Sequence, residues 1–240
     1  MILAANLKTN LTRAGTNNYI KGLEKFLNQS KPTQEVFVFP ASSSFDTFST
    51  TATIGAQNAY PVQNGAFTGE IGLDHLEEFA IKTILIGHSE RRHVIGETQE
   101  SLIKKFDFYK NQGFKIIYCI GEPLEIRKSS HENMMEYLSA QYVGIDTEYK
   151  DLIIAYEPVW AIGTGLTPTL EEIDFIHKEL KKKSPAPLLY GGSVKVNNAK
   201  EVLSLENVDG ILVGSAALDV DDFCSMIAFA DAIEKAGEKI

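Results

Sequence analysis

Eight short apolar runs recur along this 240-residue chain, and segments with helical periodicity fall between them. A continuous apolar run of this length is typical of a strand buried on both faces. Strict alternation with helices favours parallel strands joined by crossover helices. The expected strands cover residues 2–5, 36–39, 53–56, 83–86, 115–119, 152–156, 187–190 and 210–213. The expected helices include residues 17–28, 73–80, 98–111, 170–183, 197–205 and 221–236.

This alternation indicates an α/β fold. Eight units in 240 residues average 30 residues each, which fits a (β/α)8 barrel, a parallel eight-stranded closed sheet with outer helices. A doubly wound open sheet would show the same pattern, and the length alone would also allow two small domains. No linker, low-complexity tract or shift in composition divides the chain. We therefore expect a single barrel domain over residues 1–240.

The composition limits the partners of the protein. Its net charge of −9 argues against nucleic acid as a general partner, although a local site on an acidic protein can still attract a small anion. Cys119 and Cys224 lack the spacing of metal ligands or of a disulfide framework. The apolar stretch after Met1 is too short for a signal peptide, and no run is long enough to span a membrane. We expect a cytoplasmic protein without a membrane segment.

Side chains suited to acid–base chemistry follow three of the expected strands. Asn6 and Lys8 follow the first, and residues i and i+2 share a face of an extended segment. His88 follows the fourth strand, and Glu157 follows the sixth, just before Pro158. Taken singly, each of these is more often a structural or solvated group. Together they place an amine, an imidazole and a carboxylate at one end of a barrel, which is its catalytic face.

Small residues follow the last three strands. After the sixth comes an apolar loop with Trp160, Gly163 and Gly165, which we interpret as a lid over the carboxylate. The seventh strand leads into residues 190–194 and the eighth into residues 213–216, both rich in glycine and serine. Such turns expose backbone N–H groups, and a helix N-terminus adds positive potential. Two such turns after strands seven and eight indicate a phosphate site.

Several motifs occur in an order that identifies a family. They are Asn6-x-Lys8-x-Asn10, Gly65-Ala66-Phe67-Thr68-Gly69-Glu70, Gly87-His88-Ser89-Glu90-Arg91-Arg92, Cys119-Ile120-Gly121-Glu122, residues 155–165, Tyr190-Gly191-Gly192-Ser193 and Leu212-Val213-Gly214. With these motifs the chain resembles the triosephosphate isomerase family from Asn6 to Leu218. The resemblance implies interconversion of D-glyceraldehyde 3-phosphate and dihydroxyacetone phosphate through an enediolate. It implies a place in glycolysis, gluconeogenesis and the pentose shunt, with no metal and no organic cofactor.

The resemblance also assigns roles to individual residues. Glu157 would be the base that takes a proton from the carbon next to the carbonyl and returns it to the adjacent carbon. Neutral His88 would polarise the carbonyl and move protons between the enediolate oxygens, and Lys8 would supply fixed positive charge. The implied substrate-binding residues are Asn6, Lys8, Gly163, Ser193, Gly214 and Ser215.

Further roles concern the surroundings of the site. Residues 158–167 would close over the substrate and exclude water. The long connection 58–72 would dock into a second subunit with Thr68 reaching the partner's active site, which predicts a homodimer. Glu90 would pair with Lys8 or with an arginine, and Cys119 would pack behind the base as a structural residue.

The chain departs from the family pattern at three places. Ser215 stands where the family usually has glycine, and we expect phosphate binding to persist unless a positive φ is needed there. Pro168 restricts Thr167, which predicts a stiffer lid. The segment 129–150 is shorter than in many relatives, and since it belongs to the outer helical layer it concerns stability more than chemistry.

Three alternatives were weighed against this interpretation. Another sugar-phosphate barrel enzyme, such as an aldolase or epimerase, would need a Schiff-base lysine or metal ligands at the other strand ends. A catalytically silent phosphate-binding barrel would be expected to have lost Lys8, His88 or Glu157. A Rossmann dehydrogenase is disfavoured because no Gly-x-Gly-x-x-Gly motif follows the first strand.

Overall fold

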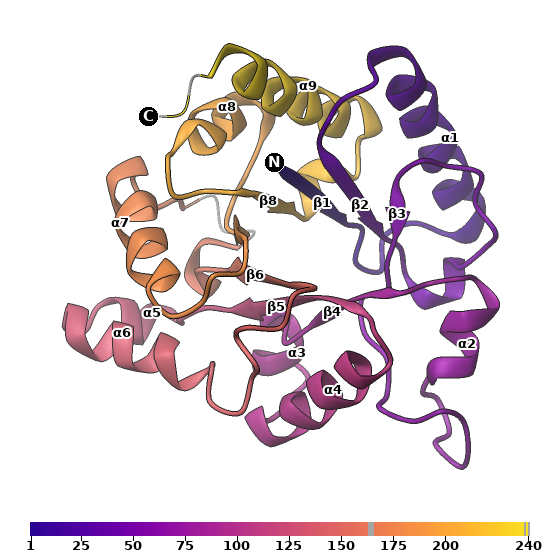
Figure 1. Ribbon diagram of the computed structural model, residues 1–240, viewed down its shortest axis with the longest axis horizontal. Coiled ribbons are helices and arrows are strands. Elements are labelled where there is room, and N and C mark those ends of the chain that lie inside the picture. Colours follow the sequence, from indigo (N-terminus) through magenta and orange to yellow (C-terminus); the bar gives the residue numbers. More distant parts are fainter. Residues whose placement is uncertain (163–165, 238, 240) are drawn as a thin grey trace.

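Eight parallel strands form a barrel surrounded by helices in a computed structural model that describes residues 1–162, 166–237 and 239 (Figure 1). The strands are β1 (Ile2–Asn6), β2 (Glu35–Phe39), β3 (Thr53–Ile54), β4 (Thr83–Ile86), β5 (Lys115–Ile120), β6 (Leu152–Tyr156), β7 (Leu188–Tyr190) and β8 (Gly210–Val213). The expected (β/α)8 barrel is therefore confirmed. The assignment of residues 1–240 to one domain stays a prediction.

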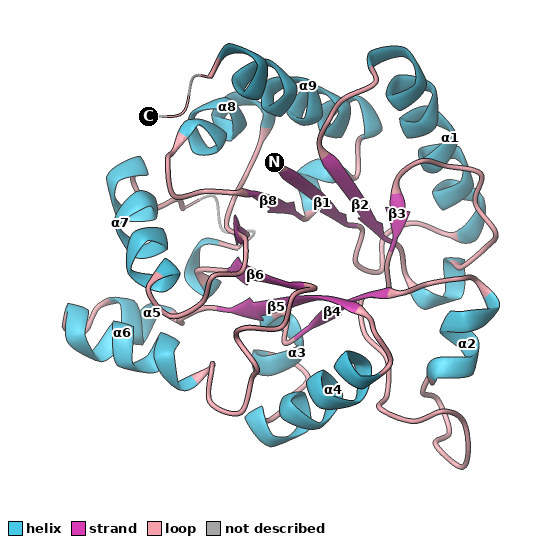
Figure 2. Cartoon of the chain, in the orientation of Figure 1, coloured by secondary structure: helices cyan, strands magenta, loops and turns pink. Residues whose placement is uncertain are grey.

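The helices lie outside the strands, as Figure 2 shows. They are α1 (Arg13–Ser30), α2 (Leu73–Glu78), α3 (Ser89–His93), α4 (Gln99–Asn111), α5 (Leu124–Arg127), α6 (His131–Ala140), α7 (Leu170–Lys181), α8 (Val196–Ser204) and α9 (Val220–Ala236). Three short 3-10 turns add Ser42–Ser44, Val159–Ala161 and Ser215–Ala217. Each of the six helices expected from the sequence occurs within a few residues of its predicted bounds.

The ring of strands closes between β3 and β4. Each of the other neighbouring pairs forms a regular parallel ladder, including β1 with β8. At β3 and β4 a single isolated bridge joins Ala56 to Ile84 in the described part of the chain. The Ala56 N–H donates to the Thr83 carbonyl at 2.9 Å, and the Leu85 N–H donates to the Ala56 carbonyl at 2.8 Å. This bridge excludes the doubly wound open sheet.

Strand alternation divides the apolar residues between two cores. In β1, Ile2 and Ala4 pack inside the barrel, whereas Leu3 and Ala5 pack between the sheet and the helices. The same alternation runs through β2 and β4 to β8, and their interior residues are Phe37, Phe39, Leu85, Ile117, Cys119, Ile153, Ala155, Leu189 and Leu212. Successive side chains of a strand point to opposite faces. At the carboxyl end of a strand, the next residue that points to the same side as the interior residues therefore faces the open end of the barrel.

Local signals fix the helix boundaries. The Thr169 hydroxyl accepts from the Glu172 N–H at 3.2 Å, and the Glu172 carboxylate accepts from the Thr169 N–H at 2.8 Å, which is a capping box at the start of α7. After α4 the chain reverses at Gly113 with φ of +69°, as expected for a glycine that ends a helix. None of the described helices is long and apolar enough to cross a membrane.

Candidate active site

A cavity of about 280 Å³ opens at the carboxyl ends of the strands. It brings together the described residues that the sequence analysis selected from five separate strand ends. Its lining includes Asn6, Lys8, His88, Glu157, Ser193, Gly214 and Ser215. Gly163, the remaining predicted substrate-binding residue, lies outside the described residues. Asn6, Glu157 and Gly214 face the cavity because each lies two residues after an interior residue of its strand, namely Ala4, Ala155 and Leu212.

Glu157 is held rigidly behind this cavity. It is only 2% exposed. Its Oε2 accepts from the Ser89 backbone N–H at 2.9 Å, and its Oε1 lies 3.1 Å from His88 Nε2. Each carboxylate oxygen therefore has one polar contact, and both partners, Ser89 and His88, follow β4. A buried carboxylate in this position is suited to act as a base, since water does not compete for its lone pairs.

The backbone of α3 orients the ring of His88. It is the residue that caps α3, and its Nδ1 accepts from the Glu90 N–H at 3.3 Å. A nitrogen that accepts a hydrogen bond carries no proton, so the proton of the neutral ring sits on Nε2. Nε2 then donates to Glu157. Gly87, with φ of +79°, makes the turn between β4 and this cap.

Lys8 reaches the cavity by a backbone conformation that the sequence analysis did not anticipate. Its φ is +50°, in the left-handed region, whereas the extended geometry assumed from residue spacing would have a negative φ. The turn is stabilised where the Lys8 N–H donates to Asn6 Oδ1 at 3.1 Å and where Gln57 donates to the Lys8 carbonyl at 2.7 Å. The ammonium group pairs with Glu90 Oε1 at 2.6 Å, as expected.

Two glycines make room for Glu157. A Cβ at Gly121 would lie 1.7 Å from the Glu157 carbonyl oxygen, and a Cβ at Gly191 would lie 2.8 Å from Glu157 Cγ. Both distances are far inside van der Waals contact. These positions therefore require glycine because the neighbouring backbone and the carboxylate arm approach so closely.

The ends of β7 and β8 form the expected cradle of small residues. Gly191, Gly192 and Ser193 follow β7, Gly214 and Ser215 follow β8, and all five line the cavity. Ser215 begins the 3-10 turn Ser215–Ala217, and it is not among the described residues with positive φ. The substitution of serine for glycine at this position therefore introduces no backbone strain.

The cavity contains one cation that the sequence analysis missed. Lys195 lines it beside Ser193 and Val194. Its position two residues beyond Ser193 was the available signal, but an exposed lysine at the start of a helix cannot be told from a solvated one by sequence. It gives the cavity a second positive charge besides Lys8, on a protein that is acidic overall.

Comparison with known proteins identifies the family. A family model described as triosephosphate isomerase matches residues 1–230. The chain belongs to the triosephosphate isomerase family. The triosephosphate isomerase of Sulfurimonas denitrificans is 71% identical over 240 residues, the full length of both chains. The triosephosphate isomerase of Sulfurovum sp. is 56% identical, and that of Wolinella succinogenes is 51% identical. Each comparison covers 95% of this chain and 99% of the relative.

In this member of the triosephosphate isomerase family, a buried carboxyl group supports the start of the loop after β6. Glu122 Oε1 accepts from Trp160 Nε1 at 3.0 Å and from the Tyr156 hydroxyl at 3.1 Å. The Val159 N–H donates to the Glu122 carbonyl at 3.1 Å. Burial raises the pKa of Glu122, and its Oε2 is buried without a hydrogen-bond partner among the described residues.

Cys119 and Arg92 have structural positions in this member of the family. Cys119 is fully buried in the barrel interior, and burial together with the charge of Glu157 raises the pKa of its thiol, so it is not an activated nucleophile. Arg92 donates to the Gly87 carbonyl at 2.8 Å and to the Cys119 carbonyl at 3.0 Å. It thereby joins the ends of β4 and β5. No group of three or more His, Cys, Asp or Glu side chains among the described residues could hold a metal ion.

Proposed function

We propose that this chain interconverts D-glyceraldehyde 3-phosphate and dihydroxyacetone phosphate, as an aldose–ketose isomerase in glycolysis and gluconeogenesis. The observation that carries the proposal is the buried Glu157 carboxylate, 3.1 Å from the imidazole of His88 in a cavity that Lys8 also lines. Membership of the triosephosphate isomerase family supports this activity. A catalytically silent barrel would be expected to have lost Lys8, His88 or Glu157, and all three are present.

Glu157 is the base in this proposal. Its carboxylate removes a proton from the carbon next to the substrate carbonyl, and the electron pair of that C–H bond forms the double bond of an enediolate. The same carboxyl group then returns a proton to the neighbouring carbon. No external oxidant or reductant is needed, because one carbon of the substrate is oxidised as its neighbour is reduced. The contact from the Ser89 N–H keeps the carboxylate aimed during both transfers.

His88 and Lys8 stabilise the charge that develops on the substrate oxygens. The Nε2–H of His88 donates to the carbonyl oxygen and exchanges protons with the two enediolate oxygens. Its Nδ1 stays unprotonated because it accepts from the Glu90 N–H. The Lys8 ammonium, fixed by Glu90, supplies a permanent positive charge, and Asn6 orients the substrate beside it. Charges held in place before reaction stabilise a transition state without reorganisation.

The phosphate group is bound at the ends of β7 and β8. Ser193, Gly214 and Ser215 offer backbone N–H groups, and Lys195 adds long-range attraction. The role of Gly163 rests on the family resemblance alone. We propose on the same ground that residues 158–167 close over the substrate, so that water is excluded and the enediolate keeps its phosphate.

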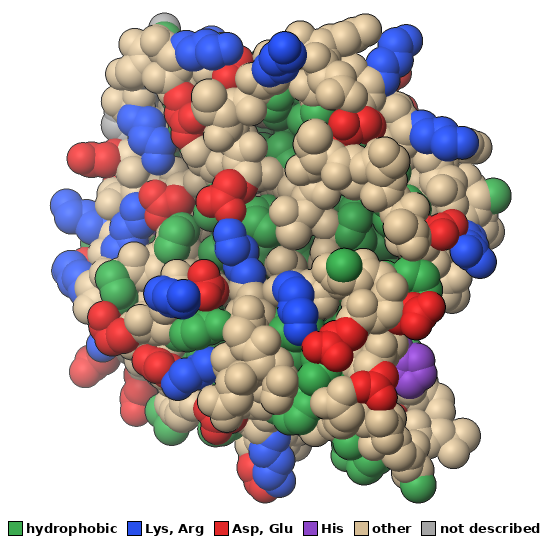
Figure 3. Space-filling model, turned by 45° about the vertical axis from the view of Figure 1, so that its right-hand side comes forward, with side chains coloured by type: hydrophobic (Ala, Val, Ile, Leu, Met, Phe, Trp, Pro, Cys, Tyr) green, Lys and Arg blue, Asp and Glu red, His purple; other side chains and the backbone are tan. Residues whose placement is uncertain are grey.

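We also propose a cytoplasmic homodimer formed through the loop that contains Thr68. Thr68 is exposed, and its neighbour Phe67 is 40% exposed. Ile95, which lines a cavity together with Gly69 and Glu70, is 62% exposed. This cavity of about 600 Å³ adjoins the active site and shares Asn6, Lys8 and His88 with it. A loop of a second subunit in this hollow would cover the side chain of Ile95, whose exposed apolar surface is unfavourable in water. On the face that Figure 3 shows, acidic and basic side chains are interspersed rather than gathered into a basic field of the kind that binds nucleic acid.

The decisive experiment measures isomerisation of D-glyceraldehyde 3-phosphate, coupled to glycerol-phosphate dehydrogenase and NADH, for the native protein and Glu157→Gln. We expect rapid turnover by the native protein and a loss of at least a thousandfold in the variant, which keeps the size of the side chain but not its basicity. A folded native protein without turnover would refute the activity. Retention of native turnover by Glu157→Gln would refute the role of the base.

A further inference from the structure

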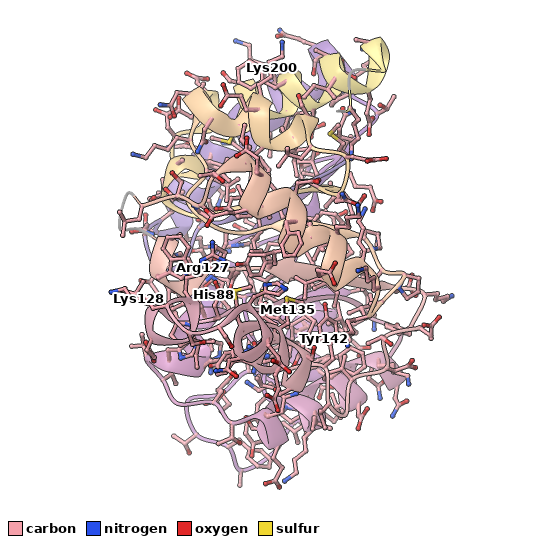
Figure 4. The ribbon with its side chains drawn as sticks, turned by 90° about the vertical axis from the view of Figure 1, so that its left-hand side faces the viewer. His88, Arg127, Lys128, Met135, Tyr142 and Lys200 are labelled. Carbon is pink, nitrogen blue, oxygen red and sulfur yellow. The ribbon has the colours of Figure 1, made fainter. Side chains whose placement is uncertain are left out.

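The side-chain amide of Gln141 pairs with the backbone of Gly121. Its Nε2 donates to the Gly121 carbonyl at 3.0 Å, and its Oε1 accepts from the Gly121 N–H at 3.1 Å. Figure 4 looks onto this side of the molecule, with labels on Met135 of α6 and on Tyr142, the residue after Gln141. Gln141 directly follows α6, and Gly121 directly follows β5. A residue of the outer helical layer therefore binds the end of a barrel strand through two buried hydrogen bonds.

This amide takes the place of a neighbouring strand. The carbonyls of Ile120 and Glu122 both accept from the chain that continues β6, at 2.7 and 3.1 Å. Because the backbone groups of an extended chain alternate in direction, the N–H and the carbonyl of Gly121 face the opposite side, where β4 lies. The ladder between β4 and β5 has already ended at that point. Without Gln141, two buried backbone groups would lose their partner, which is costly.

Gly121 lies directly against the proposed base. A Cβ at Gly121 would be 1.7 Å from the Glu157 carbonyl oxygen and 3.3 Å from the Glu157 Cα. The Glu157 N–H donates to the carbonyl of Ile120, the residue before Gly121, at 2.7 Å. In packing this close, a displacement of Gly121 moves the backbone of Glu157, and the carboxylate moves with it.

Gln141 is itself fixed by a polar network behind the barrel wall. Its backbone carbonyl accepts from the Tyr118 hydroxyl at 2.8 Å and from Gln99 Nε2 at 2.9 Å. The same hydroxyl accepts from Arg92 Nη2 at 2.9 Å, and Arg92 Nε donates to the Gly87 carbonyl at 2.8 Å. The network therefore joins Gln141 to β5 and, through Arg92, to the turn after β4.

We propose that Gln141 is a positioning residue for proton transfer, which acts on Glu157 through Gly121. The inference rests on the proposed isomerase activity. It gives a role in the reaction to the segment 129–150, which the sequence alone relates to stability more than to chemistry. Glutamine suits the position because its amide is both a donor and an acceptor, as are the N–H and the carbonyl of one residue. A carboxylate only accepts, and asparagine is shorter by one methylene group.

Loss of this pair should lower kcat and leave KM unchanged. A misplacement of about 1 Å can lower a rate about a hundredfold, so a shift of Glu157 by a fraction of that distance should cost about tenfold. The proposed phosphate cradle is built on the ends of β7 and β8, whereas Gln141 contacts the end of β5. Binding of the phosphate group should therefore persist. Inorganic phosphate, used as a competitive inhibitor, measures that binding separately from proton transfer.

The test compares three variants with the native protein in the coupled isomerase assay. Gln141→Met removes the donor and the acceptor and keeps a side chain of similar length. Gln141→Glu keeps an acceptor for the Gly121 N–H, but its carboxyl group donates to the Gly121 carbonyl only when it is protonated. Gln112→Met is the matched control, because Gln112 also directly follows a helix, α4, but is exposed.

We expect Gln141→Met to lower kcat about tenfold, with KM and the inhibition constant of inorganic phosphate close to the native values. Gln112→Met should equal the native protein in all three quantities. For Gln141→Glu, the ratio of its kcat to the native kcat should rise as the pH falls from about 8 to about 6, because burial raises the pKa of a carboxyl group and protonation restores both hydrogen bonds. Groups that titrate in both proteins cancel in this ratio.

Two results with Gln141→Met would overturn the inference. One is a kcat equal to that of Gln112→Met. The other is a joint change of kcat, KM and phosphate inhibition by similar factors, which would indicate a general distortion of the barrel. Should Gln141→Met fail to fold, Gln141→Glu decides the question, and a kcat ratio that does not change with pH would overturn the inference. A folded native protein without turnover would instead refute the proposed function itself.

Discussion

A single added methyl group at Gly191 should displace the proposed base without removing it. The Cβ of an alanine there would lie 2.8 Å from Glu157 Cγ, whereas ordinary contacts are 3.4–4 Å. Gly191 is not among the glycines with positive φ, so its backbone accepts alanine. The contact must be relieved by movement of the carboxylate arm. That movement is opposed by the Ser89 N–H and by the burial of the side chain.

The size of the effect follows from this geometry. The arm must withdraw by about 0.6 to 1.2 Å to restore ordinary contact, and a misplacement of about 1 Å can lower a rate about a hundredfold. That factor corresponds to about 2.7 kcal/mol of activation free energy. We therefore expect kcat of Gly191→Ala to fall about a hundredfold, while far-UV circular dichroism shows a native fold.

The coupled isomerase assay measures this prediction, with Gly15→Ala as the control. Gly15 lies in α1, where an added Cβ would be 3.5 Å from Thr12 Oγ1 and remote from the cavity. The control should retain native kcat and, as alanine is the better helix former, equal or greater stability. A Gly191→Ala protein with kcat within threefold of the native value would refute the argument, because Glu157 would then not need its observed position.

Three further predictions follow from groups around the site. Burial lowers the pKa of His177 to about 4, so the folded protein binds fewer protons than the unfolded chain below pH about 6.5 and loses stability as the pH falls. Between pH 7 and 5 the free energy of unfolding of His177→Gln should therefore fall by about 2 kcal/mol less than that of the native protein, measured by urea unfolding at both pH values. Equal falls in the two proteins would contradict this. Lys195→Gln should raise KM several-fold with unchanged kcat, and added salt should raise KM less in the variant than in the native protein; an unchanged KM would exclude a role in substrate attraction. Thr169→Ala should lower the free energy of unfolding by about 1 kcal/mol through loss of the α7 cap, and a stability equal to native would show that the capping contact contributes little.

The barrel could be predicted from the sequence because its strands are buried on both faces. Such strands are continuous apolar runs. Three of the eight strands, Thr83–Ile86, Leu152–Tyr156 and Gly210–Val213, have the bounds that the sequence predicts. That the candidate residues lie together could also be predicted, because side chains alternate along a strand and Asn6 and Glu157 then face the open end of the barrel. Whether the sheet closes into a barrel could not be read from the sequence, because in the described residues β3 and β4 are joined by one isolated bridge, between Ala56 and Ile84.

Other features had no signal in the local sequence. The left-handed φ of Lys8 arises from contacts with Asn6 and with the distant Gln57. The pair of Gln141 and Gly121 joins residues 20 positions apart, and it exists only once the end of α6 lies beside the end of β5. The short helix α3 was missed because its five residues are too few for helical periodicity, and its cap is a histidine rather than a usual capping residue.

The bridge between β3 and β4 makes one seam of the barrel easier to open than the others. β3 has two residues, and its ladder with β2 pairs two positions. Amide hydrogens near this seam should therefore exchange with solvent at a lower opening free energy than those of β5 or β6. The connection that follows β3 carries Thr68, the residue proposed to enter the second subunit. Dissociation of the proposed dimer and opening of the barrel would then be linked equilibria. A higher protein concentration favours the dimer, so hydrogen exchange of the Ala56 amide should slow as the concentration rises.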